Sequence, residues 1–206
     1  MKNDALFLYG ALETKPFVFT YLQNKIEIVH GPSCKIAQEI NIDLCKQDNI
    51  PVIARRGGGG TVVLLPGMLI TIVVGEKLKS DGPLDIFSKI HENMILLLSS
   101  TGIKGIEQKG ISDLALNNRK VLGSSIYIGA RPELYYYQSS LIINSNLGSI
   151  SRYLLHPPRE PDYRMNRPHD QFCTSLALEG FNTDPEIIRG LFSKHLQNKL
   201  ALSIWL

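Results

Sequence analysis

Residues Ile53 to Val62 read IARRGGGGTV, the most informative segment of the chain. Two arginines precede four consecutive glycines, and the segments on either side are apolar. A glycine costs about 0.5–1 kcal/mol relative to alanine in regular structure, so such a run indicates a backbone that approaches another group closely. Backbone N–H groups that converge on one point bind anions, and neighbouring guanidinium groups add charge and forked donors. The candidate anion-binding residues are Arg55, Arg56, Gly57, Gly58, Gly59 and Gly60.

Two familiar phosphate-binding motifs do not describe this run. No Gly-Lys-Ser or Gly-Lys-Thr follows the glycines, which excludes a Walker loop. No third glycine opens a helix, which excludes a dinucleotide fingerprint. A flexible hairpin tip with two solvated arginines is the alternative interpretation of the run taken alone.

A second segment carries the other charged candidates. A lysine follows the dipeptide Asn117-Asn118, which tolerates positive φ and favours a tight hairpin. A lysine on a strand can reach over a ligand at the sheet surface and stabilise negative charge that builds on an oxygen. A solvated lysine at a turn is the alternative. The candidate residues of this segment are Asp113, Lys120, Gly123 and Ser124.

Strand-like and helix-like segments alternate along the chain without repeats. Hairpins outnumber β-helix-β units, which predicts an α+β fold with a mixed, mostly antiparallel sheet flanked by helices. No linker divides the chain, so a single domain over residues 1–206 is expected. The expected strands are 17–22, 26–29, 51–54, 61–65, 68–74, 114–116, 120–128 and 135–144, and the expected helices are 33–46, 83–100, 147–155 and 183–200.

Local signals specify some of these elements further. Ser33 is the expected cap of the helix over 33–46. Pro66-Gly67 is expected to join strands 61–65 and 68–74 as a pair, and Asn117-Asn118 to join the next hairpin.

Composition limits the class of protein. With 206 residues, 44% of them hydrophobic, and a formal net charge of +3, the chain can bury a core and is not expected to be disordered. Its apolar runs are shorter than the roughly 20 residues that span a bilayer, so no membrane partner is expected. Mild basicity does not indicate nucleic acid. Three cysteines without paired spacing, and an N-terminus without a secretory pattern, predict a cytoplasmic protein. The five histidines show no metal-ligand spacing, so no metal site is expected.

The two charged segments together carry a family resemblance. Arg-Arg-Gly-Gly-Gly-Gly-Thr-Val is followed by an Asp-Leu strand, then by Arg-Lys-Val-Leu-Gly-Ser, and then by a strand that ends Leu-Ile-Ile-Asn. This order resembles the lipoate–protein ligase family, within the biotin and lipoate ligase superfamily, over roughly residues 16 to 180. A later stretch, DYR at 162–164 with HDQFCTSL at 169–176, resembles the end of that catalytic domain.

The resemblance implies a fold and an activity. The expected fold is the class II synthetase-like α+β catalytic domain, whose sheet holds lipoate or octanoate in a tunnel. ATP with Mg²⁺ would activate the acid to an acyl-adenylate. The acyl group would then pass to a lysine of a lipoyl carrier domain, of the 2-oxoacid dehydrogenase E2 or glycine cleavage H protein type. Acyl transfer through a mixed anhydride needs positioning and cationic stabilisation more than it needs a nucleophile.

The same resemblance implies roles for the candidate residues. Lys120 takes the place of the family's essential lysine, which bonds the acyl carbonyl and phosphate oxygens. The arginines and glycines of 55–60 would line the acyl-adenylate site, Gly123 and Ser124 would lie beside the lysine, and Asp113 would lie near adenine or ribose.

The sequence departs from the family pattern at several places. Val63-Leu64-Leu65 stand where the family has an aromatic-His-Asp step, and Gly110-Ile111-Ser112-Asp113 replace Gly-Arg-Asn-Asp. Gln138-Ser139 stand where a His-Gly pair is expected. The accessory domain of longer ligases is not found, so a second ligase subunit is a candidate partner.

Two other functions stay open. Related octanoyltransferases use a cysteine nucleophile with the lysine and need no ATP, and Cys173 is the only cysteine near a family motif. The other alternative is a non-catalytic subunit that binds the carrier domain or the acyl ligand. The sequence does not separate lipoate from octanoate.

Overall fold

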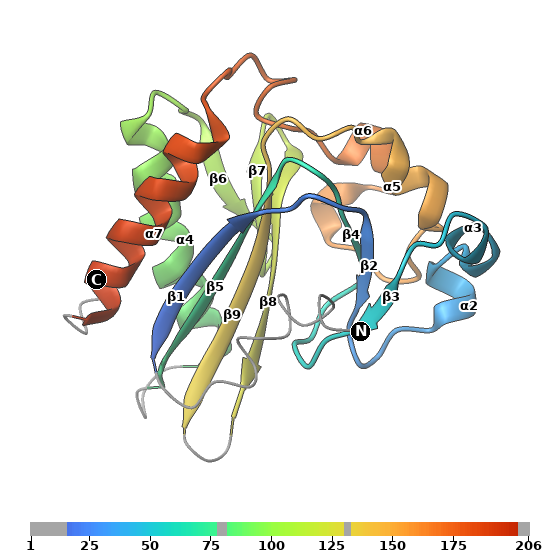
Figure 1. The fold of residues 1–206 in the computed structure, drawn as a ribbon, viewed down its shortest axis with the longest axis horizontal. Coiled ribbons are helices and arrows are strands. Elements are labelled where there is room, and N and C mark those ends of the chain that lie inside the picture. The colour runs from blue at the N-terminus through green and yellow to red at the C-terminus, as the bar shows by residue number, and fades with distance from the viewer. Residues whose placement is uncertain (1–15, 78–81, 130–132, 202–206) are drawn as a thin grey trace.

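The computed structural model describes residues 16–77, 82–129 and 133–201. Within these ranges the strands form a six-stranded sheet, in the order β1-β5-β9-β8-β7-β6, and a three-stranded sheet, in the order β3-β2-β4 (Figure 1). All neighbours in the larger sheet are antiparallel. In the smaller sheet β2 pairs with β3 in parallel and with β4 antiparallel. The predicted α+β fold with a mixed, mostly antiparallel arrangement is confirmed.

The bounds of the elements follow the sequence pattern closely in most places. The larger sheet contains β1 (Phe17–Leu22), β5 (Met68–Glu76), β9 (Leu134–Ile142), β8 (Arg119–Ile128), β7 (Asp113–Leu116) and β6 (Ile106–Lys109). The smaller sheet contains β3 (Val52–Ala54), β2 (Glu27–His30) and β4 (Val62–Leu64). The helices are α2 (Ile36–Glu39), α3 (Ile42–Gln47), α4 (Pro83–Ser100), α5 (Gly148–Tyr153), the 3₁₀ turn η2 (Asp162–Arg164), α6 (His169–Phe172) and α7 (Pro185–Ala201).

The six-stranded sheet is covered on both faces. Figure 1 shows α4 and α7 on one side of it, and the smaller sheet with α2, α3, α5 and α6 on the other. Each face has its own apolar core. In β5, for example, Met68 and Ile70 pack toward the smaller sheet, whereas Leu69 and Val73 pack toward α4 and α7. A strand that is buried on both faces reads as a continuous apolar run, as this one does.

Helix α4 has the predicted bounds. The Asp85 carboxylate accepts a hydrogen bond from the Gly82 backbone N–H at 2.8 Å, which satisfies a donor at the start of the helix. The sequence predicts one apolar stripe on this helix, formed by Leu84, Phe87, Ile90, Met94 and Leu97 or Leu98. All of these residues are buried except Leu84, which is exposed. Within the described ranges, no helix combines the length and the apolar content that a membrane span needs.

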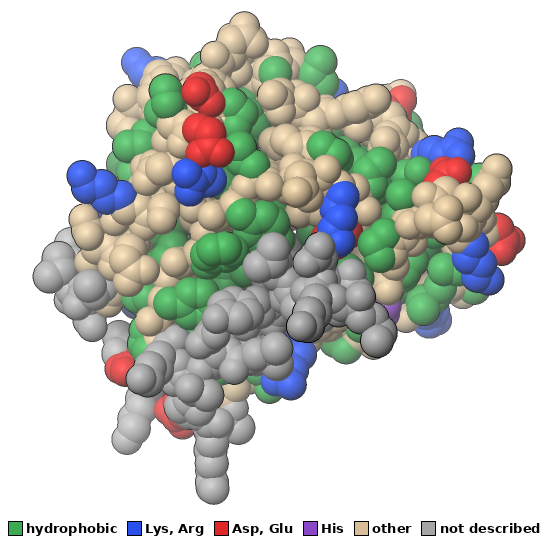
Figure 2. Space-filling view, in the orientation of Figure 1, with side chains coloured by type: hydrophobic (Ala, Val, Ile, Leu, Met, Phe, Trp, Pro, Cys, Tyr) green, Lys and Arg blue, Asp and Glu red, His purple; other side chains and the backbone are tan. Residues whose placement is uncertain are grey.

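On the face seen in Figure 2, basic side chains are scattered among acidic and hydrophobic ones rather than gathered in one patch.

The hairpin between β7 and β8 is confirmed. Asn117 and Asn118 have φ angles of 50° and 61°, and the strands on either side pair antiparallel. Two consecutive residues with positive φ give a turn whose twist matches that of the flanking strands.

The prediction of a single helix over 33–46 is wrong. Two short helices, α2 and α3, are separated by Ile40, which is extended and forms an isolated β-bridge with Leu154. Asn41, not Ser33, caps α3 by accepting from the Leu44 N–H. The bridge places Ile40 in the core at 2% exposure, and this burial interrupts the helix.

The pairing of 61–65 with 68–74 is also wrong. β4 pairs with β2 in the smaller sheet, whereas β5 pairs with β1 and β9 in the larger one. Pro66-Gly67 is therefore a crossover between sheets. The connection from β1 to β2 is a second crossover between the sheets. The two crossovers lie side by side, because Gly67 N–H donates to Gln23 O at 2.9 Å and Gln23 N–H donates to Met68 O at 2.8 Å.

We expect Leu98→Ala to lower the free energy of unfolding by about 2–5 kcal/mol, because it opens a cavity in the core. Leu98 is completely buried on α4, whereas Leu96 is 67% exposed on the same helix. Leu96→Ala is the matched control and should change the free energy by less than about 0.5 kcal/mol. Urea denaturation measures both, and equal losses would contradict the orientation of α4.

Acid should destabilise the protein through buried histidine. Burial lowers the pKa of His91 to about 4, from 6.5. As pH falls from 6.5 toward 4, the unfolded chain takes up a proton that the folded chain does not, so the free energy of unfolding decreases in this window. His91→Gln should reduce this pH dependence, while His169, whose pKa is also lowered to about 4, retains part of it. Urea denaturation across the window checks this, and an unchanged slope in the variant would refute it.

Candidate active site

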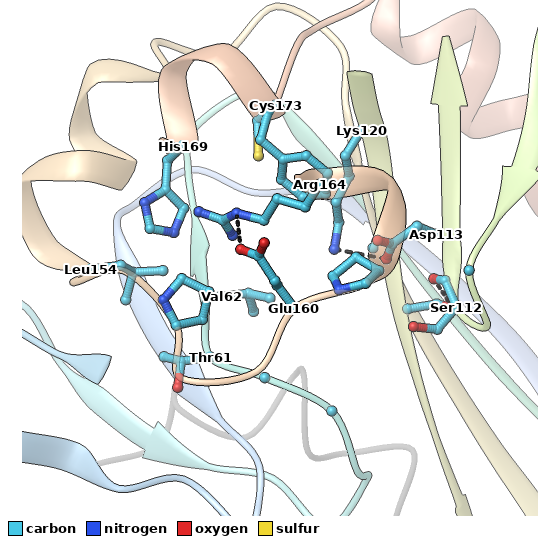
Figure 3. Close-up of a pocket in the computed structure, with 18 of the residues that line it drawn as sticks. Thr61, Val62, Ser112, Asp113, Lys120, Leu154, Glu160, Arg164, His169 and Cys173 are labelled. Carbon is cyan, nitrogen blue, oxygen red and sulfur yellow. Dashed lines mark hydrogen bonds and ion pairs between the residues drawn. The ribbon is translucent and has the colours of Figure 1, made fainter. Parts of the chain in front are cut away.

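A cavity of about 740 Å³ lies between the six-stranded sheet, the smaller sheet and the loop 157–168 (Figure 3). Both charged segments of the sequence reach it, although they are far apart in the chain. Its lining includes, among the predicted site residues, Arg55, Gly59, Gly60, Asp113, Lys120, Gly123, Ser124 and Cys173.

A β-bulge brings Lys120 to the cavity face. Asp113 lies opposite Gly123 and Leu114 opposite Leu122, but Ala115 lies opposite Lys120, so β8 has one extra residue at Val121. In a regular strand Lys120 and Gly123 would point to opposite faces, because their separation is odd. The bulge reverses this alternation, and both residues line the cavity.

The Lys120 ammonium lies over Gly123 and against Asp113. Its Nζ is 2.7 Å from Asp113 Oδ1, and the lysine side chain is 22% exposed. A Cβ at position 123 would lie 2.8 Å from both Cε and Nζ of Lys120. Glycine at this position is therefore required for the observed path of the lysine side chain.

The segment after α6 holds the backbone of Lys120 from the other side. Lys120 and Cys173 form an isolated parallel bridge, and Thr174 N–H donates to Lys120 O at 2.9 Å. Arg119 donates to Cys173 O, also at 2.9 Å. The stretch that resembles the end of the family domain thus packs directly beside the lysine.

The Arg55 guanidinium shapes the glycine run from inside. It donates to Val29 O at 3.2 Å, to Gly58 O at 2.9 Å and to Gly60 O at 2.7 Å, and the residue is 5% exposed. Burial lowers the pKa of Arg55 to about 10, so the side chain stays charged at neutral pH. Gly59, between the two bonded carbonyls, has a φ of +96°, which other residues rarely adopt. Both terminal nitrogens of Arg55 are therefore bonded to backbone carbonyls.

The other three residues of the run lie outside the cavity lining. The Arg56 guanidinium stands 5.7 Å from the centre of the Tyr127 ring. Gly57 packs on Ser125, where a Cβ would lie 2.8 Å from the hydroxyl, and Gly58 N–H donates to Ile126 O at 3.3 Å. This half of the run attaches the loop to β8.

Ser124 is connected to a histidine that the sequence did not indicate. Its hydroxyl donates to Ser112 O at 2.7 Å, and its oxygen lies 3.1 Å from His91 Nε2. His91 is completely buried on α4, four residues after Phe87 on the apolar stripe. The spacing of four residues from Phe87 was a signal in the sequence that His91 is buried. The polarity of histidine, however, favours a position on the surface.

The loop 157–168 supplies buried charges that the sequence did not assign to the site. Arg164 is 5% exposed, its Nε lies 3.3 Å from Glu160 Oε2, and its guanidinium packs over the Phe172 ring at 4.8 Å. Burial lowers the pKa of Arg164, and burial together with the Arg164 charge lowers that of His169 to about 4. Its arginines and Asp162 suggest a loop that is simply solvated, but Arg164 is buried in the protein.

Cys173 lines the cavity but lacks the features of an activated nucleophile. Burial raises the pKa of its thiol, although Lys120 and Arg164 oppose the shift. A reactive cysteine has a lowered pKa and partial exposure, whereas Cys173 is 7% exposed.

Another part of the wall is apolar. Met68, Ile142, Ile150 and Leu154 line the cavity and are buried. Glu39 also lines it; hydrogen bonds from Thr61 Oγ1 at 2.6 Å and from Lys35 N–H at 3.1 Å outweigh the effect of burial and lower its pKa. A cation beside an apolar wall suits a ligand with an anionic head and a hydrocarbon chain.

In residues 16–77, 82–129 and 133–201, no group of three or more His, Cys, Asp or Glu side chains is arranged to hold a metal ion.

Comparison with known sequences points to one family. The chain matches the lipoyl protein ligase A/B catalytic domain over residues 4–197. The lipoate–protein ligase of Streptococcus pyogenes is 29% identical over 128 residues, which are 62% of this chain and 33% of that protein. Lipoate–protein ligase 2 of Staphylococcus aureus is 27% identical over 140 residues, 68% of this chain and 39% of that protein. The chain spans less than half the length of the curated relatives it matches.

Solved structures share the fold. A structure of the bi-partite lipoate protein ligase system of Thermoplasma acidophilum matches with a TM-score of 0.74 at 16% identity, covering 98% of this chain and 85% of that chain. A lipoate-protein ligase A bound with ATP matches with a TM-score of 0.73 at 16% identity, covering 98% and 87%. Because the family match extends over nearly the whole sequence and the fold agrees with it, this chain belongs to the lipoyl protein ligase A/B catalytic domain family.

Proposed function

We propose that this protein attaches lipoate or octanoate to a lysine of a lipoyl carrier domain, through an acyl-adenylate formed from ATP. The observation that carries the proposal is the convergence of Lys120, the glycine run organised by Arg55 and an apolar wall on one cavity. Relatives in Streptococcus pyogenes and Staphylococcus aureus are named lipoate–protein ligases, and one neighbour in fold has ATP bound.

The first proposed step forms the acyl-adenylate. A carboxylate oxygen of the acid attacks the α-phosphorus of ATP, and the bond from that phosphorus to the bridging oxygen of the leaving pyrophosphate breaks. Mg²⁺ would enter with the triphosphate as part of the substrate. The Lys120 ammonium would stabilise the charge that builds on the phosphate and carbonyl oxygens.

The second proposed step transfers the acyl group. The neutral amine of the carrier lysine attacks the acyl carbonyl carbon, the bond to the phosphate oxygen breaks, and AMP leaves with the electron pair while the amine loses a proton to solvent. No nucleophile of the protein is needed, so the contribution of the site is position and charge. Arg55 contributes by holding the shape of the loop, since its donors are bonded to backbone carbonyls.

The proposed partner is a carrier domain of the 2-oxoacid dehydrogenase E2 or glycine cleavage H protein type. One protein with this fold comes from Thermoplasma acidophilum, and its structural study concerns a bi-partite lipoate protein ligase and its E2 lipoyl domain. Because that ligase is bi-partite, we also propose that a second ligase subunit supports adenylation. The described region would then act as one catalytic domain, in the cytoplasm, where its three free cysteines stay reduced.

Replacing the lysine should abolish the reaction. The protein is incubated with ATP, Mg²⁺, lipoate or octanoate and an apo carrier domain, with and without a candidate second subunit, and mass spectrometry follows the carrier. Lys120→Ala should lower the acylation rate about 100-fold or more, as expected for loss of a charge-stabilising donor. Lys104→Ala, which changes an exposed lysine, should acylate normally. Full activity of Lys120→Ala would contradict the proposed role, and no acylation by the wild type in any combination would favour a binding subunit.

The cysteine-dependent transferase makes a different prediction. Because Cys173 is buried with a raised pKa, we expect Cys173→Ala to retain ATP-dependent acylation. Cys45→Ala is the matched control, since Cys45 is also buried but does not line the cavity. Acylation from an acylated donor carrier without ATP, lost in Cys173→Ala and kept in Cys45→Ala, would instead establish the transferase.

A further inference from the structure

One carboxylate joins Lys120 to the loop 157–168. Asp113 Oδ1 lies 2.7 Å from the Lys120 ammonium, and Asp113 Oδ2 accepts a hydrogen bond from the Tyr163 hydroxyl at 2.9 Å. Asp113 is 6% exposed, so neither contact is readily exchanged for one to water. In Figure 3 the lysine and Asp113 face each other at the sheet end of the cavity.

Tyr163 is itself held in place. Its ring packs on the Phe172 ring with centroids 5.1 Å apart, and Arg167 donates to its backbone carbonyl at 2.7 Å. Burial, with the neighbouring Asp113 charge, raises the pKa of the tyrosine, so its hydroxyl keeps the proton that it donates. The phenol is therefore a fixed donor.

Two bonds to different oxygens fix the rotation of the Asp113 carboxylate. Without the phenol, the carboxylate could turn, and the ammonium at the end of a flexible four-carbon chain could follow it. An ammonium has three donors, and the bond to Asp113 occupies one of them. The other two are then available to an anionic ligand from a defined position above Gly123.

We propose that Tyr163 is a positioning residue that acts through Asp113 to fix the Lys120 ammonium in the cavity. This inference rests on the proposed function for its consequence in catalysis, but the positional effect is independent of it. Tyr163 lies in the DYR stretch at 162–164, but the sequence gives it no role, because its partner Asp113 lies on β7, fifty positions earlier in the chain.

The first test measures the lysine directly. The intact protein is treated briefly with acetic anhydride, and peptide mass spectrometry gives the acetylation rate at Lys120 relative to the exposed Lys104. Tyr163→Phe should raise this ratio about fivefold, corresponding to the loss of one hydrogen bond. Tyr127 packs on the Tyr136 ring and does not line the cavity, so Tyr127→Phe should leave the ratio unchanged. An unchanged ratio in Tyr163→Phe would overturn the proposal.

A double variant separates positioning from simple loosening of the loop. In an Asp113→Asn background the carboxylate is absent, so adding Tyr163→Phe should not raise Lys120 acetylation further. A further increase of the same size would show that the phenol acts without Asp113 and would overturn the proposal.

The second test uses the reaction. Tyr163→Phe should lower kcat for carrier acylation about fivefold with little change in KM for the acid, and should add nothing to Asp113→Asn. Independent, multiplying losses would refute action through Asp113. If the wild-type protein acylates no carrier, the proposed function fails, whereas the acetylation ratios still decide the positional inference.

Discussion

One extra residue in β8 determines that Lys120 faces the cavity. Without the bulge at Val121, Lys120 would point away from Gly123 and toward the core under α4. With it, the lysine lies over glycine, and its ammonium pairs with Asp113 in the neighbouring strand. The bulge sits next to a tight turn and is bonded on its other side by the segment 173–174, so contacts from both directions maintain it.

The cavity uses its cations in two different ways. Arg55 is buried, and its terminal nitrogens donate to carbonyls of β2 and of the glycine run. It therefore fixes the conformation of the glycine run. Lys120 is partly exposed and keeps donors beyond the one given to Asp113. The distinction follows from chemistry, because a planar fork with five donors suits several fixed carbonyls, whereas a compact ammonium suits a ligand whose charge changes during reaction.

Prediction from the sequence succeeded where the signal was local. The Asn117-Asn118 turn and the apolar stripe of α4 fix their elements within a few residues, and both are confirmed. It failed where a distant partner overrode the local pattern. Ile40 interrupts a helix to bridge Leu154, and the chain at Pro66-Gly67 leaves one sheet for the other beside Gln23. Such pairings depend on burial of the whole core, so a short segment of sequence does not predict them.

The fold class, the family and the two segments that meet at the cavity are predictable from the sequence, because glycine runs, turn dipeptides and a charged residue on a strand carry their physical constraints locally. Which members of those segments line the cavity depends on tertiary contacts. Arg56 lies against Tyr127, and Arg55 donates to backbone carbonyls. The structure also adds His91, which no motif marks, and gives a partner to Tyr163, whose DYR stretch had no assigned role. The reason is that the exposure and hydrogen-bond partners of a side chain depend on neighbours that are remote in sequence.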